Sequence, residues 1–98
     1  MSEQNTLLKF GHKFQTKVIS SLLGEKVFLQ TICDILEPEY FDADSNKWIA
    51  QTIRDYFFEY KTSPTLEVMK VKIDEIENDI LKVAVVDGLK ESWRLIQS

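Results

Sequence analysis

The sequence predicts an all-α protein, a small bundle of about five helices. Apolar residues recur at spacings of three and four along almost the whole chain, which is the period of a helix with one buried face. The chain contains only three glycines and two prolines, so the helical pattern has few interruptions. Its 98 residues are enough for one small domain, and we treat residues 1–98 as a single unit.

The first predicted helix spans three to four turns and stops at Gly24. Its apolar residues recur every four positions at Phe10, Phe14, Val18 and Leu22, with Leu7, Ile19 and Leu23 beside them. Glycine is a common residue at helix C-termini because it tolerates a left-handed backbone. The chain starts with polar residues, so residues 1–8 are predicted to be disordered or frayed. The globular helical bundle is predicted to occupy residues 9–76.

A second helix is predicted from about Glu25 to the residue before Pro38. Proline restricts the backbone of the residue that precedes it, which ends the helix there. The buried face of this helix is predicted to comprise Phe28, Ile32, Ile35 and Leu36. Tyr40 and Phe41 follow in a short connection, and we expect these two rings to fill the core from a turn.

The third predicted helix starts at Asp44 or Ser45, either of which can serve as its N-cap. Its apolar stripe comprises Ile49, Ile53, Tyr56, Phe57 and Tyr60, and Trp48 and Thr52 widen it. Residues 61–65 form a loop, in which Ser63 is expected to cap the fourth helix and Pro64 to occupy its first position. The stripe of the fourth helix comprises Leu66, Met69, Ile73 and Ile76.

The last predicted helix, residues 78–98, has an apolar arc that covers roughly half of its circumference. This arc comprises Leu81, Val85, Val86, Leu89, Trp93 and Ile96. So wide an arc needs two surfaces to pack against, which we expect to be the domain's own core and a partner subunit or a further helix. The six residues are therefore candidates for a self-association surface. The alternative is that this helix only closes the core of the monomer.

Three further features of this segment bear on its interpretation. The opposite arc is polar and comprises Asp87, Lys90, Glu91 and Arg94. The valines at positions 83, 85 and 86 also permit a short strand, but the apolar spacing continues past Gly88 and favours a helix. The sequence ends at Ser98 within the helical pattern, without a glycine or proline stop signal. We therefore expect the chain to be a piece of a longer protein.

Composition and charge exclude several classes of function. The chain has 12 Lys and Arg against 16 Asp and Glu, a formal net charge of −4, and its cations do not cluster strongly. Direct DNA binding by this domain is therefore expected to be weak or absent. The three glycines form neither a P-loop nor a dinucleotide-binding motif, and one cysteine with one histidine cannot form a Cys/His zinc site. No catalytic, cofactor or metal site is expected in this chain.

Single residues that could carry chemistry have simpler interpretations. His12 lacks a recognisable nucleophile or carboxylate partner and is predicted to be a surface or capping residue. Cys33 lies in an apolar helical pattern and is expected to be a buried small hydrophobe. Asp42 and Asp44 are not followed by the glycine and glutamate of a calcium loop, and they suit helix capping.

Signals for export or membrane insertion are missing from the sequence. No apolar run approaches the roughly 20 residues of a membrane span, and no signal-peptide core follows the polar start. A single cysteine fits a reducing compartment. The chain is therefore expected to be cytoplasmic, in the cytoplasm of a bacterial host if a phage encodes it.

Three segments stand out between residues 10 and 76. They are Val18–Leu23, Ile35–Phe41 (ILEPEYF) and Glu59–Pro64 (EYKTSP), and the last two flank a capped helix with aromatic anchors. This order of motifs resembles the N-terminal domain of DnaB-type replicative helicases. The turn and the Ser-Pro loop look most like the branch found in T-even-type bacteriophages. The residues of this core and turn signature are Pro38, Tyr40, Phe41, Trp48, Ile53 and Phe57.

The resemblance implies an all-α bundle that projects above an ATPase ring as a collar. In that family a helical hairpin pairs with the hairpin of a neighbour to give dimers within a hexamer, and the collar docks primase and, in phages, the helicase loader. ATP and Mg²⁺ would bind only in a separate RecA-like domain of the parent protein. Residues 78–98 would then be the first helix of a truncated dimerisation hairpin.

Three functions compete at this point. The first is the non-catalytic oligomerisation and primase- or loader-docking domain of a phage-type replicative DNA helicase. The second is a free-standing small helical regulator that binds a host or phage protein. The third, a helical DNA-binding domain, is opposed by the net charge of −4.

Overall fold

The computed structural model describes the backbone of residues 11–97 and the side chains up to residue 96. Five α-helices and one short 3-10 helix follow one another in this range: α1 (Gly11–Gly24), α2 (Lys26–Ile32), η3 (Pro38–Tyr40), α3 (Asp44–Tyr60), α4 (Leu66–Asp74) and α5 (Asp79–Gln97). No strand occurs among the described residues. The predicted all-α bundle of about five helices is confirmed. The disorder predicted for residues 1–8 concerns positions outside the described residues.

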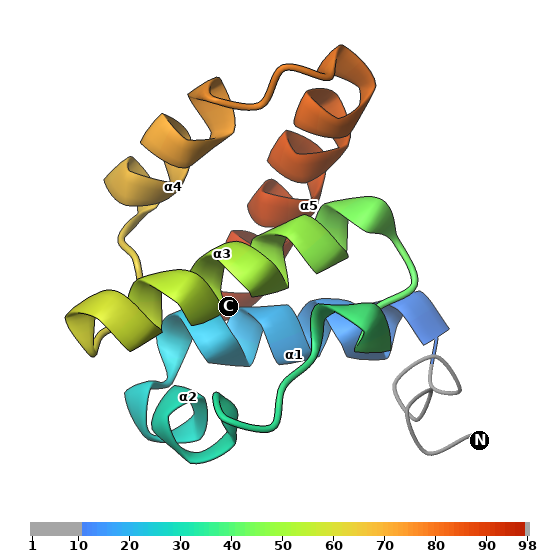
Figure 1. The fold of residues 1–98 in the computed structure, drawn as a ribbon. Coiled ribbons are helices and arrows are strands. Elements are labelled where there is room, and N and C mark those ends of the chain that lie inside the picture. The colour runs from blue at the N-terminus through green and yellow to red at the C-terminus, as the bar shows by residue number, and fades with distance from the viewer. Residues whose placement is uncertain (1–10, 98) are drawn as a thin grey trace.

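Helix α5 is the element around which the bundle closes. It packs against both α1 and α3, and α1 also packs against α2 and α3. In Figure 1, α1 and α3 cross the middle of the molecule, α2 lies on one side of them and α4 on the other. Helix α4 touches α5 over a smaller area and lies at the edge of the bundle. Residues 79–97 therefore belong to the same core as the rest of the domain.

Helix α1 buries Ile19 and Leu23 as predicted, but its buried face includes Gln15 in place of Phe14. Phe14 is 40% exposed, whereas Gln15 is 1% exposed. The side-chain oxygen of Gln15 accepts a hydrogen bond from the backbone N–H of Asp42 at 2.8 Å, so the amide is satisfied inside the fold. Leu22 is buried as predicted. The predicted contributions of Leu7 and Phe10 fall outside the described residues.

Helix α2 is shorter than predicted, because it ends at Ile32 and not at the residue before Pro38. The backbone N–H groups of Ile35 and Leu36 both bond to the carbonyl of Ile32, which turns the chain back toward the core. Leu29, Cys33 and Leu36 are buried, and Phe28 and Ile32 are half-buried. Ile35 is 68% exposed, so its predicted place in the core is wrong. The turn after α2 directs Ile35 away from the buried face that its spacing predicts.

The connection around η3 places Phe41 in the core. Its ring is 0% exposed, while Pro38 and Tyr40 are half-buried beside it. The backbone N–H of Phe41 bonds to the carbonyl of Pro38 at 3.1 Å, which holds the turn closed. The prediction that aromatic residues in this turn fill the core is confirmed, with Phe41 as the fully buried residue.

Helices α3 and α4 bury most of the stripes that their spacing predicts. Ile49 and Ile53 of α3 and Met69 and Ile73 of α4 are buried. Trp48, Tyr56, Phe57, Leu66 and Ile76 are half-buried. Tyr60 is the exception, since it is exposed in the last turn of α3.

The N-caps of these helices differ from the predicted ones. Helix α3 starts at Asp44 and its N-cap is Ala43, which makes no side-chain capping bond. Helix α4 is capped by Thr65, whose hydroxyl accepts a bond from the N–H of Val68 at 3.2 Å. Ser63, the predicted cap, instead donates to the carbonyl of Leu23 at 3.4 Å. The loop thus ties α1 to the start of α4.

Gly88 lies where α5 crosses α3. A Cβ at this position would stand 3.6 Å from Asn46 Oδ1 and 3.6 Å from Ile49 Cδ1, which is ordinary contact distance. Gly88→Ala is therefore expected to raise the free energy of unfolding by about 0.5–1 kcal/mol, through helix propensity. Gly88→Leu is expected to lower it, because a larger side chain must displace Asn46 or Ile49. Urea unfolding measures the free energy of unfolding of both variants. If alanine and leucine changed it equally, Gly88 would not lie close to α3.

Candidate functional site

The six predicted self-association residues of α5 do not share one surface. Val85 is 0% exposed in the chain's own core and is not open to a partner in this conformation, and Leu89, which is 5% exposed, packs in the same core. Leu81, Val86 and Trp93 are half-buried. Ile96 is partly exposed, and its side-chain carbons lie 3.3–3.5 Å from the position that a Cβ at Gly24 would take. The wide apolar arc is thus divided between the core and the surface.

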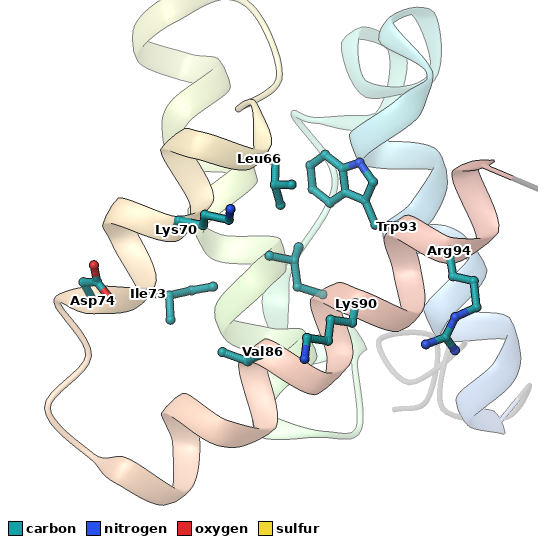
Figure 2. Close-up of a pocket in the computed structure, with 9 residues that line it drawn as sticks. Leu66, Lys70, Ile73, Asp74, Val86, Lys90, Trp93 and Arg94 are labelled. Atoms are coloured by element: carbon teal, nitrogen blue, oxygen red, sulfur yellow. The ribbon is translucent and has the colours of Figure 1, made fainter.

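A groove runs between α4 and α5, and we call it the α4–α5 groove. Its volume is about 650 Å³, within the range of concave sites that bind small molecules or inserted side chains. It is lined by Leu66, Lys70, Ile73, Asp74, Val86, Leu89, Lys90, Trp93 and Arg94. Figure 2 shows Leu66 and Trp93 facing each other at one end, and Ile73 and Val86 at the other. The groove exists because α4 touches α5 only sparsely.

The rim of the groove is mainly basic. Lys70, Lys90 and Arg94 are exposed there, and Asp74 is the single carboxylate. Among the described residues, no ion pair involves any of these four side chains. The sequence placed Lys90 and Arg94 on a polar face opposite the apolar arc, and it did not single out Lys70 as part of a site. Their shared position follows from the packing of α4 against α5.

A short apolar stripe continues from the groove toward the start of α5. Ile80 is 84% exposed and Val83 is 61% exposed. The steps from Ile80 to Val83 and from Val83 to Val86 are each three residues, so the three side chains lie on neighbouring parts of one face. We call Ile80 and Val83 the α5 stripe. Sequence reasoning did not include them in the apolar arc, although their spacing is helical.

A second hollow of about 620 Å³ lies between the starts of α3 and α5. Leu81 and the signature residue Trp48 both line it, together with Asp44 and Ile80. The walls of this hollow are not purely apolar, because they include Asp44 and Ser45 in the polar first turn of α3. This hollow explains why Leu81 and Trp48 are only half-buried.

The residues that could carry chemistry do not gather in either hollow. Cys33 is buried, and burial raises the pKa of its thiol above the ordinary value of 9.0, which keeps it protonated at neutral pH. His12 Nε2 lies 3.5 Å from Glu91 Oε1 near the surface. No group of three or more metal-ligating side chains occurs among residues 11–96. Asp42 and Asp44 are both exposed.

No helix in the described part of the chain is both long enough and apolar enough to cross a membrane. Comparison of the chain with protein-family models, curated proteins and solved structures found no match. The α4–α5 groove and the α5 stripe are therefore interpreted from their own geometry and charge.

Proposed function

We propose that the chain is the non-catalytic N-terminal oligomerisation and docking domain of a DnaB-type replicative DNA helicase, close to the T-even-type bacteriophage branch. The observation that carries this proposal is the division of α5, which closes the core with Val85 and keeps apolar surface at Val83 and Trp93. The motifs at Ile35–Phe41 and Glu59–Pro64 support the choice of family. ATP-dependent unwinding, with its ATP and Mg²⁺, belongs to another domain of the parent protein.

The two surfaces of α5 suit the two tasks of such a domain. Exposed apolar side chains favour association because contact removes them from water. The α5 stripe is thus the surface for a second copy of the chain, leading to dimers and, in the parent, a hexamer. The α4–α5 groove is the surface for primase or the helicase loader. These assemblies would form in the cytoplasm of the bacterial host.

The double variant Ile80→Lys with Val83→Lys is expected to weaken self-association at least about tenfold, because two ammonium groups replace the apolar contact. Sedimentation equilibrium over a range of protein concentrations measures the dissociation constant. The matched control is Val27→Lys with Ile35→Lys, which changes an equally exposed valine and isoleucine near α2. Equal association of the two double variants would contradict a role for the α5 stripe.

The assignment to a helicase has a separate test in the gene. Reading the gene beyond codon 98 is expected to reveal a P-loop motif, G-x-x-x-x-G-K-[ST], in the same reading frame. A stop codon directly after codon 98 would overturn the helicase assignment and favour the free-standing regulator. In that case the α4–α5 groove would remain the docking surface, for a host or phage protein.

A further inference from the structure

The α4–α5 groove differs in charge from the chain that carries it. The whole chain has a net charge of −4, but the rim holds three cations and one carboxylate. Lys70, Lys90 and Arg94 have no ion-pair partner among the described residues, so their charges are available to a ligand. A locally positive rim attracts an acidic ligand, whereas the rest of this acidic chain repels it.

We propose that the α4–α5 groove binds an acidic amphipathic helix of a partner protein. The proposal rests on the docking role given above and specifies the chemistry of the docked segment. The partner helix would place apolar side chains on the groove floor and carboxylates beside the basic rim. Two helices that leave an apolar channel between them commonly accept a third helix in this way.

The apolar floor of the groove sets the length of the docked segment. This floor comprises Leu66, Ile73, Val86, Leu89 and Trp93. Leu66 and Ile73 mark its two ends on α4, and they lie seven positions apart in the sequence. At about 1.5 Å per residue this corresponds to roughly 10 Å, or two turns of a helix. Trp93 and Val86 mark the same two ends on α5 (Figure 2). A partner helix of two to three turns therefore covers the floor with apolar residues spaced by three and four positions.

The rim sets the positions of the acidic residues. Lys70 extends from α4 toward α5, and Lys90 extends from α5 alongside Val86 (Figure 2). Arg94 lies one turn beyond Lys90, so two cations follow each other along α5. Asp74 points away from α5 at the outer edge of α4. Carboxylates of the partner are thus favoured on both sides of its apolar face near Lys70 and Lys90.

The probe for this proposal is a synthetic helical peptide of about 15 residues, with leucines spaced by three and four positions and glutamates beside them. Its counterpart carries lysine in place of every glutamate. Binding is followed by the emission of Trp93 in a Trp48→Phe background, because the chain has two tryptophans. The glutamate peptide is expected to bind saturably and at least about tenfold more tightly than the lysine peptide. Its affinity should fall as salt is added.

Variants of the rim connect the binding to the groove. Lys70→Glu with Lys90→Glu is expected to weaken binding of the glutamate peptide at least about tenfold, and Lys70→Gln with Lys90→Gln to have an intermediate effect. The matched control, Lys17→Glu with Lys26→Glu, changes two exposed lysines on α1 and α2 and alters the net charge equally. This control is expected to stay within about twofold of the original chain.

Several results would overturn the proposal. They are the absence of saturable binding, equal binding of the two peptides, and equal losses in the rim and control variants. Emission of Trp93 that depends on protein concentration without peptide would assign the groove to a second copy of the chain. The rim variants should self-associate as the original chain does, so failure of the groove and failure of the α5 stripe are distinguishable.

Discussion

Val85→Asp is expected to lower the free energy of unfolding by at least about 3 kcal/mol, a large part of the roughly 5–15 kcal/mol that a domain possesses. Val85 is 0% exposed, on the helix that packs against both α1 and α3. A carboxylate placed there has nearly the shape of the valine side chain, but it loses its water without gaining a partner, which is the source of the destabilisation. Urea unfolding followed by circular dichroism measures the change.

Val83→Asp is the matched control, because it makes the same substitution two residues earlier on α5. Val83 is exposed, so the change in its unfolding free energy is expected to stay within about 0.5 kcal/mol. The helix-propensity difference between valine and aspartate is common to both variants, and their comparison therefore isolates burial. Both are measured at a dilution at which the chain is monomeric. Equal stability of the two variants would mean that α5 does not close the core.

Phe41→Ala is expected to lower the free energy of unfolding by about 3–5 kcal/mol. The ring of Phe41 is fully buried and enters the core from the turn after η3. Removing it leaves a cavity that the surrounding side chains can fill only in part. Thermal or urea unfolding gives the size of the loss.

Ile35→Ala serves as the comparison for Phe41→Ala. Ile35 lies in the same connection between α2 and α3 but is largely exposed, so an effect below about 0.5 kcal/mol is expected. The apolar spacing of the sequence predicts the opposite, since it places Ile35 in the core stripe. If Ile35→Ala and Phe41→Ala lowered the free energy of unfolding by similar amounts, Ile35 would belong to the core as the spacing predicts. The turn after Ile32 would then not expose it.

The elements predicted best are those with strong and regular stripes. Helices α3 and α4 bury Ile49, Ile53, Met69 and Ile73 as their spacing indicates, although α3 also buries the polar side chain of Asn46 on the same face. Prediction failed where two adjacent residues could each face the core. In α1 the buried residue is Gln15 and not Phe14.

The burial of Gln15 in place of Phe14 depends on a contact between distant parts of the chain. Gln15 can be buried because the backbone N–H of Asp42, 27 residues away, bonds to its side chain. The local periodicity of the sequence does not reveal this hydrogen bond. The end of α2 at Ile32 is a similar case, because the turn that follows is stabilised by placing Leu36 and Phe41 in the core.

The candidate site was predicted in part. The sequence singled out Val86 and Trp93, which do line the α4–α5 groove. It assigned Lys90 and Arg94 to a solvated face, because a single helix gives no indication of where its neighbour ends. The groove arises only where α4, nine residues long, leaves the side of α5 uncovered.

From the sequence alone follow the all-α class, the approximate number of helices and the excess of apolar surface on α5. These properties depend on the local spacing of side chains along the chain, which is visible without a structure. Only the tertiary structure decides that Val85 and Leu89 lie in the core, that Trp93 is half-buried against it and that Val83 is exposed. The physical reason is that periodicity measures how much apolar surface a helix must bury, whereas the packing of distant helices determines what covers it.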